Sequence, residues 1–221
     1  MALNDAAVLT AAVGYVFIAD PGTARPTPAA LSALDLDDLV AAPKAAAKGA
    51  KNGEVAEEDV AAATAAAVER TLPAGWTSVG HTSRGDLPEF GFDGGDTEVR
   101  GTWQNESLRE IVTKPIADYL TLTLHQFDTE SFELYFGKNA STTPGVFGVA
   151  GATPDPVEKA LLVVIVDGDT KVGFYAPKSS VRRDDSISLS VDEFAGLPVR
   201  ATFLKHNNAN KFEWFAEGLF N

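Results

Sequence analysis

The segment Gly75–Ile111, GWTSVGHTSRGDLPEFGFDGGDTEVRGTWQNESLREI, is the most informative part of this chain for its fold class. It is rich in glycine and acidic residues, yet it contains three pieces with the composition of β-strands: Trp76–Thr82, Glu89–Asp93 and Thr97–Gln104. In the third piece Val99, Gly101 and Trp103 alternate with polar residues. Because alternation with a period of two is typical of a strand with one buried face, we expect Thr97–Gln104 to be half-buried.

The remainder of the chain adds more strands and two short helices. Strands are predicted at Val13–Ile18, Tyr119–His125, Leu161–Val166, Val172–Pro177, Val199–Phe203 and Phe212–Phe215. Asp167-Gly168-Asp169 predicts a hairpin turn between two of them. Thr27 is the expected N-cap of a helix through Leu39, and Asp128 that of a helix through Phe136. Short strands joined by long loops favour a mainly β chain, a β-sandwich or barrel with a short flanking helix.

Residues 40–73 differ from the segments on either side. They are rich in alanine, turn at Asn52-Gly53 and then follow a helical pattern over Glu54–Arg70 with only a thin apolar stripe. Alanine propensity would hold such a helix more than burial would. We therefore expect residues 1–39 and 74–221 to form the β domain, and residues 40–73 to be a helical insertion outside its core.

Composition excludes several classes of protein. The 221 residues carry a net charge of −13, so the chain is not expected to grip DNA, which is itself a polyanion. It contains no cysteine, and this excludes disulfides, thiol nucleophiles and cysteine zinc sites. The apolar run Ala6–Ala19 follows Asp5 rather than a basic segment, and it is too short to cross a bilayer. We expect neither a signal peptide nor a membrane partner.

Candidate catalytic chemistry is weak throughout. The three histidines, His81, His125 and His206, lie in strand-like or loop segments, and the chain lacks the G-x-S-x-G motif of a hydrolase. Aspartates such as Asp93 and Asp96 lie in glycine turns without the spacing of a calcium loop. We therefore predict no enzyme, and no catalytic, cofactor-binding or metal-binding residues.

One block of charge is more suggestive, Arg182-Arg183-Asp184-Asp185. Its simplest interpretation is a solvated surface loop. Its functional interpretation is a contact between subunits, in which the cations of one copy meet the anions of the next. Such pairs add little stability when exposed, but they can fix the register between identical copies.

The chain also resembles the major tail tube proteins of long-tailed bacteriophages, particularly those that infect actinobacteria. The specific part is the run Val79–Asn105, VGHTSRGDLPEFGFDGGDTEVRGTWQN. Further matching segments are Leu120–Asp128, Leu161–Gly168, Val181–Asp185 and Leu197–His206. The resemblance covers residues 2–34 and 75–215 and leaves out residues 40–73.

The resemblance implies a structural virion protein, assembled in the host cytoplasm, with itself as its main partner. Hexameric rings would stack into a hollow tube through which DNA is ejected without specific binding. A tape measure protein and tail terminator and tip proteins are the other implied partners. The loop Gly137–Pro156 and the chain ends are candidates for ring-to-ring contacts, and the acidic balance predicts a negative lumen. The alternative from another class is a monomeric acidic β-sandwich that acts as a decoration or adhesion domain.

Overall fold

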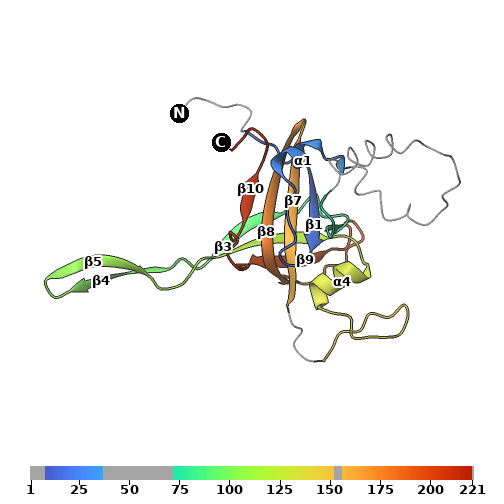
Figure 1. Cartoon of the computed structure of the whole chain (residues 1–221). Helices are drawn as coiled ribbons and strands as arrows, with labels where there is room; N and C mark the ends of the chain where they lie inside the picture. Colours follow the sequence, from blue (N-terminus) through green and yellow to red (C-terminus); the bar gives the residue numbers. More distant parts are fainter. Residues whose placement is uncertain (1–7, 37–71, 152–155, 221) are drawn as a thin grey trace. The chain divides into compact units, whose positions relative to one another are not determined.

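The computed structural model describes residues 8–36, 72–151 and 156–220 (Figure 1). These residues are mainly β, with antiparallel strands and two short helices, as predicted. Nearly all of the predicted insertion at 40–73 lies outside the described residues. The chain divides into two compact units. Unit 1 comprises Met1–Gly80, Lys159–Lys178 and Lys205–Asn221, and unit 2 comprises His81–Glu158 and Ser179–Leu204.

Unit 1 is built on antiparallel strands in the order β2-β1-β7-β8, with β10 also paired to β8. The bounds are β1 Val13–Ala19, β2 Thr77–Ser78, β7 Val157–Asp167, β8 Thr170–Arg183 and β10 Glu213–Phe215. The first part of β8 belongs to unit 1 and its last residues to unit 2. Strand β7 lies between β1 and β8, which confirms the central position that its apolar run predicts.

The core of unit 1 forms where helix α1, Pro28–Ala33, meets the sheet. Phe17 on β1 lies opposite Leu162 on β7, and both are buried together with Leu31 of the helix. Thr27 caps the helix as predicted, since its Oγ1 accepts from the backbone N–H of Ala30 at 3.2 Å.

Helix α1 ends at Ala33, earlier than the predicted Leu39. Lys171 gives the reason, because its Nζ donates to the carbonyl oxygens of Ser32 at 2.9 Å and of Leu34 at 2.5 Å. These bonds satisfy carbonyls that a longer helix would have bonded internally. Leu34 is already extended, with φ −60° and ψ 132°.

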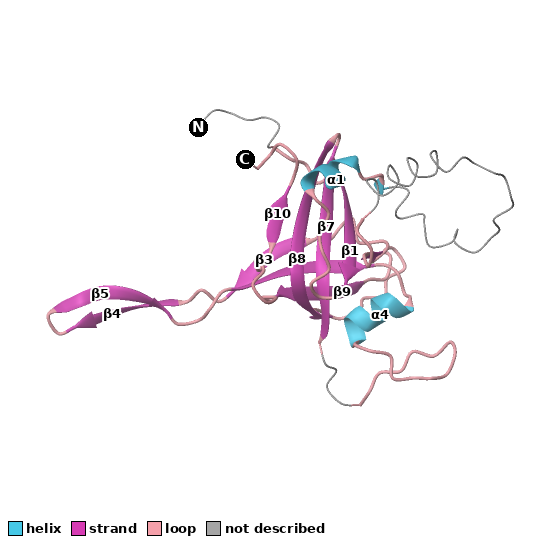
Figure 2. Cartoon of the chain, in the orientation of Figure 1, coloured by secondary structure: helices cyan, strands magenta, loops and turns pink. Residues whose placement is uncertain are grey.

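Unit 2 contains the strands β9, β6 and β3, in that order from the end of β8, and a separate pair formed by β4 and β5 (Figure 2). Their bounds are β3 Glu89–Asp93, β4 Thr97–Thr102, β5 Asn105–Val112, β6 Ala117–Leu124 and β9 Leu197–Phe203. Strand β3 has the predicted bounds. The predicted strand Trp76–Thr82 is shorter than expected: only Thr77–Ser78 pair as a strand, Gly80 turns with φ 79°, and Thr82 forms an isolated bridge to Leu124.

Alternating residues of β6 and β9 form the buried face of unit 2. Leu120 and Leu122 on β6 lie opposite Ala201 and Val199 on β9, and all four are buried. Helix α4, Thr129–Phe136, packs near β9 and buries Leu134 and Tyr135. Asp128 is its N-cap, since its Oδ1 accepts from the N–H of Ser131 at 2.8 Å.

The loop that follows α4 is described up to Gly151, and over these residues it has no regular secondary structure, but hydrogen bonds organise it. Oδ1 of Asn139 accepts from the N–H groups of Ser141 and Gly148, both at 2.9 Å. The N–H of Ala140 also donates to the carbonyl of Gly148 at 2.9 Å. One asparagine side chain thus closes the two ends of this loop segment onto each other.

Candidate assembly surfaces

The β4–β5 hairpin is the most exposed regular structure in the described part of the chain. Every residue of β4 is exposed, and so is every residue of β5 except Ile111, which is intermediate. The prediction that Thr97–Gln104 is half-buried is therefore wrong for the isolated chain. The alternation is real, but the residues that the structure describes provide nothing to cover the apolar face. An isolated two-stranded hairpin is at best marginally stable in water.

The register of the hairpin separates its side chains into two faces. Directly opposed residues share a face, and Thr97 lies opposite Val112 while Val99 lies opposite Glu110. We call these four residues the Val99 face. Val99 is 57% exposed and Val112 is 62% exposed. An apolar pair of this kind, flanked by one carboxylate, has the chemistry of a contact surface rather than of a solvated strand.

The opposite face of the hairpin carries like charges in register. Arg100 on β4 lies directly opposite Arg109 on β5, a pairing that disfavours an isolated hairpin. Glu98 approaches Arg100 at 3.3 Å, but both side chains are largely exposed, so this ion pair contributes little. A second anion from outside the hairpin would relieve the repulsion.

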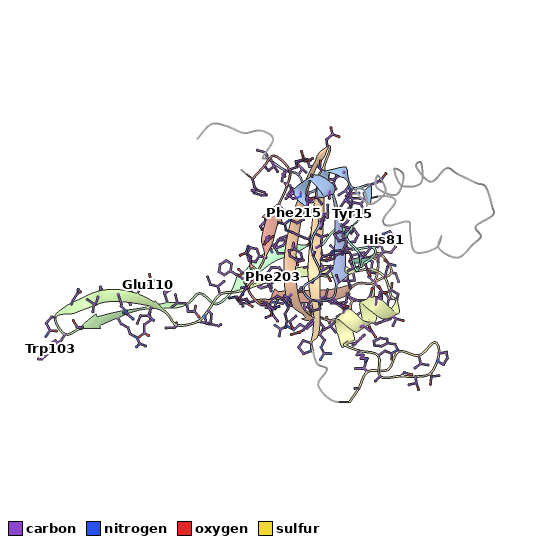
Figure 3. All side chains as sticks on the ribbon, in the orientation of Figure 1. Tyr15, His81, Trp103, Glu110, Phe203 and Phe215 are labelled. Atoms are coloured by element: carbon purple, nitrogen blue, oxygen red, sulfur yellow. The ribbon has the colours of Figure 1, made fainter. Side chains whose placement is uncertain are left out.

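Trp103 lies at the tip of the hairpin, as labelled in Figure 3, and its side chain is 98% exposed. With Gln104 it forms the two-residue turn between Thr102 and Asn105. Neither turn residue has the positive φ that the favoured hairpin turns require, so the tip lacks a local stabilising turn. The register shifts beside this turn, where a Cβ on Gly101 would lie 2.2 Å from the carbonyl oxygen of Glu106. Only glycine fits there.

The base of the hairpin is closed by hydrogen bonds between its two legs. The N–H of Gly95 donates to the carbonyl of Lys114 at 3.0 Å, and Oγ1 of Thr113 donates to the carbonyl of Asp96 at 3.0 Å. Gly94 has φ 85°, and a Cβ there would lie 2.4 Å from the carbonyl oxygen of Pro115. The two legs of the arm thus stay paired down to their base, while the length and tip of the arm are exposed.

The structure divides the block Arg182–Asp185 into two parts. Arg182 and Arg183 end strand β8 and are exposed, and no ion pair is recorded for either among the described residues. Asp184 and Asp185 have roles within the chain. Asp184 lies 4.0 Å from Arg200, and the carbonyl of Asp185 accepts from the hydroxyl of Tyr135 at 2.6 Å. The carboxylate of Asp185 accepts only from the N–H of Ser186, at 2.6 Å, so within this block only Asp184 lies beside a cation of its own chain among the described residues.

Arg200 organises the polar face of the unit 2 sheet. Its guanidinium lies 3.5 Å from the ring centroid of Tyr119, in a cation–π contact, and it pairs with Asp93 on β3. Its Nε is buried without a hydrogen-bond partner in the described part of the chain. The contact set joins β9, β6 and β3 and fixes the edge strand β3 in place.

A groove of about 780 Å³ lies beside the two free arginines, and we call it the α4 groove. Leu134 and Phe136 of helix α4 form one wall. Val149, Val157 and Val181 add apolar surface, while Arg182 and Arg183 lie at its β8 side. The volume falls within the roughly 300–1,000 Å³ typical of clefts that hold a small molecule, so a large aromatic side chain fits there.

The shifted titratable groups belong to the structure of unit 1. Nε of Arg25 donates to Glu213 at 2.7 Å, and this hydrogen bond lowers the pKa of the Glu213 carboxyl. Burial raises the pKa of Tyr175, with Glu213 as a second cause, and its hydroxyl donates to the carbonyl of Thr23 at 2.7 Å. Each group has a structural partner, so neither indicates a catalytic acid or base.

The histidines do not come together as a catalytic set. Nδ1 of His125 lies 3.0 Å from the carbonyl oxygen of Ala195, and Nε2 of His206 lies 3.1 Å from the side-chain amide of Asn207. Among the described residues there is no cluster of three His, Cys, Asp or Glu side chains that could hold a metal ion. In that same part of the chain, no helix combines the length and apolar character needed to span a membrane.

These surfaces, with no catalytic set beside them, agree with what related sequences show. The whole chain, residues 1–221, matches the phage tail tube protein family. The chain belongs to this family. It is 52% identical over 220 residues to the major tail protein Gp23 of Mycobacterium phage D29, which covers 100% of this chain and 96% of that protein. It is also 52% identical over 221 residues to Gp23 of Mycobacterium phage L5, again covering 100% and 96%.

Family membership makes this chain a structural tail tube subunit and not an enzyme. The match also extends through residues 40–73, which the resemblance read from the sequence left out. The exposed hairpin is the functional feature that sequence reasoning missed. Its signal was present in the alternation of Thr97–Gln104, but alternation does not say which chain supplies the cover.

Proposed function

We propose that the tail tube subunit polymerises with itself into hexameric rings and that the rings stack into a hollow tube. The observation that carries this proposal is the β4–β5 hairpin, an exposed arm whose apolar side chains are uncovered in the isolated chain. A second copy of the chain is the simplest source of cover in a protein that belongs to a tube-forming family.

The sheet edges support the same proposal. β2 and β3 end the strand order, so each offers backbone N–H and C=O groups to a further strand. Exposed edges invite uncontrolled pairing unless they are covered or closed. Pairing of edges between copies closes a ring, and head-to-tail contacts that do not close give an open stack.

The overall charge suits passage of DNA through the tube. With a net charge of −13, the subunit can present an acidic lumen that a polyanion traverses without specific binding. Lysine and arginine would then gather at subunit contacts and outer surfaces. A reconstruction of the tube in which the lumen-facing residues sum to a positive charge would contradict this part of the proposal.

Other parts of the chain have secondary roles in the proposal. Arg182 and Arg183 contribute the cations of a subunit contact, while Asp184 and Asp185 hold the loop that follows them. The loop Gly137–Pro156 and the chain ends contribute to contacts between rings. Residues 40–73 stay outside the β core. Assembly takes place in the host cytoplasm without a membrane, and the tube meets a tape measure protein inside and terminator and tip proteins at its ends.

Electron microscopy of the concentrated protein and of virions tests the proposal. We expect hollow tubes of the purified chain, and antibody labelling along the tail of the virion. A chain that stays monomeric at high concentration, or antibody labelling confined to the capsid or the adhesion tip, would instead support a monomeric decoration or adhesion domain.

A further inference from the structure

We propose that the tip of the β4–β5 hairpin of one subunit docks into the α4 groove of a second copy. In this contact Trp103 fills the apolar part of the groove, and Arg182 and Arg183 of the receiving copy pair with Glu106 and Glu110 of the hairpin. The inference rests on the proposed self-assembly and deepens it, since it assigns the two surfaces that meet.

The hairpin side of the contact is a large aromatic ring with no role in its own subunit. Trp103 is 98% exposed, and no ring contact or hydrogen bond is recorded for it among the described residues. By contrast, Trp76 donates from its indole to the carbonyl of Ala24 at 2.9 Å, and Trp214 makes an edge-to-face contact with Phe174. Tryptophan is enriched among the residues that dominate binding energy at protein interfaces.

The groove side offers the complementary surface. Leu134 and Val181 are buried at its floor, while Val149 is 51% exposed and forms part of its open wall. An indole in this position would cover the apolar wall and lie beside two guanidinium groups. Arginine over an aromatic face is attracted by the ring as well as by neighbouring carboxylates.

Charge complementarity selects a second copy as the occupant. Glu106 follows the tip turn and Glu110 lies on the Val99 face, and no ion pair is recorded for either within the described residues. Arg182 and Arg183 are likewise without an ion pair in the part of the chain described. Asp184 also lines the groove, but Arg200 already lies beside it. The arm also carries Arg109, but on the face opposite Glu110, so the two anions of the arm and the two cations of the groove are the complementary groups.

The arm is long enough to reach another molecule. Six residues of β4 span about 20 Å at roughly 3.3 Å per residue. The bonds of Gly95 and Thr113 join the two legs of the arm at its base, so the tip is carried on a closed hairpin. A preformed hairpin lowers the entropy that binding must overcome.

Cysteine cross-linking between copies tests the contact directly, because the natural chain contains no cysteine. Two single-cysteine variants, Gln104→Cys at the tip and Val149→Cys in the groove, are mixed in equal amounts, assembled and oxidised. We expect a covalent dimer that forms only in the mixture. The matched control pairs Gln104→Cys with Asn208→Cys, an exposed residue of unit 1 that lies outside the groove, and should give little dimer.

The possible outcomes distinguish docking of the hairpin tip from tube assembly itself. Tubes that form without the cross-link would overturn the docking proposal while leaving tube assembly intact. A mixture that gives neither tubes nor oligomers would overturn both. Since Trp103 is fully exposed, Trp103→Ala should leave the circular dichroism of the subunit unchanged and still impair assembly, whereas Trp103→Phe should retain most of it.

A charge exchange tests the assigned ion pairs. Replacing Arg182 and Arg183 with Glu should raise the concentration needed for tube formation roughly tenfold, the change that about 1.4 kcal/mol produces. Replacing Glu106 and Glu110 with Lys should do the same. Combining all four changes in one chain should restore assembly to near the natural level. Failure of the combined variant, with each subunit folded, would contradict the pairing.

Discussion

The β1–β7 pair and the β4–β5 pair are both antiparallel but have opposite environments. In the first, Phe17 and Leu162 are buried under helix α1 within unit 1. In the second, Val99 and Val112 share a face that the described chain leaves open. Strand β7 is an apolar run whose middle residues are all buried, whereas β4 alternates as a half-buried strand does and is nevertheless exposed. The proposed assembly explains this contrast, since in an assembling protein the burial that a strand pattern indicates can be supplied by a second chain.

The largest effect is expected for the β1–β7 pair, whose side chains are buried in unit 1. Phe17→Ala should lower the free energy of unfolding of the monomer by roughly 3–5 kcal/mol, because it leaves a cavity beneath α1. Val99→Ala in the hairpin should change it by less than about 0.5 kcal/mol. Urea denaturation monitored by circular dichroism measures both. Equal losses would show that the hairpin is part of the core of the monomer.

The second prediction uses Gly173, a glycine of β8 in the sheet of unit 1. A Cβ at Gly173 would lie 2.4 Å from the ring of Phe215, so Gly173→Ala should destabilise the monomer by roughly 1–3 kcal/mol through overpacking. Gly14→Ala is the matched control in the same sheet, since the nearest atom to its Cβ is a backbone oxygen at 3.6 Å. Thermal unfolding of the two variants should separate them clearly, and a Gly173→Ala chain as stable as the control would contradict the packing described.

The third prediction applies a glycine-to-alanine substitution to the exposed β4–β5 hairpin. Gly101→Ala places a Cβ against the carbonyl of Glu106 and should distort the tip of the hairpin. Because the hairpin adds little to the core, monomer stability should change by less than about 0.5 kcal/mol while tube yield falls. Sedimentation of tubes and denaturation of the monomer are measured on the same preparation. A loss of monomer stability without a loss of tubes would show that the hairpin belongs to the core of the monomer and not to an assembly surface.

The fourth prediction is the smallest and concerns pH. Arg25 lowers the pKa of Glu213, so their ion pair stabilises the folded subunit above the ordinary carboxyl pKa of 4.5. That contribution should be lost as the pH falls through the lowered pKa. Both side chains are about 30% exposed, so the effect is small. Glu213→Gln should flatten the acid side of the stability profile, and an unchanged acid profile in this variant would exclude the pair as its cause.

Local patterns predicted much of the fold. Strand Glu89–Asp93, the alternation of Leu120 with Leu122, and the N-caps Thr27 and Asp128 all follow from a few neighbouring residues. Distant contacts decided the rest. Helix α1 ends early because Lys171, far along the chain, bonds its last carbonyls. No local pattern contains that contact.

The candidate site was predicted only in part, for the same reason. Arg182 and Arg183 were recognisable as part of a charge block. The sequence does not show that Arg200 lies beside the carboxylate of Asp184, or that the hydroxyl of Tyr135 donates to the carbonyl of Asp185. The α4 groove joins a helix, a loop and a strand end that lie far apart in sequence. The sequence identified Trp103 only as one residue of an alternating strand. The structure shows that Trp103 is almost fully exposed in the isolated chain.

A reconstruction of assembled tubes by electron cryomicroscopy would show directly what surrounds Trp103. We expect the indole to be buried in the α4 groove of another subunit, with Arg182 and Arg183 of that subunit beside Glu106 and Glu110. A tube in which Trp103 remains exposed to solvent, or packs against its own subunit, would contradict it.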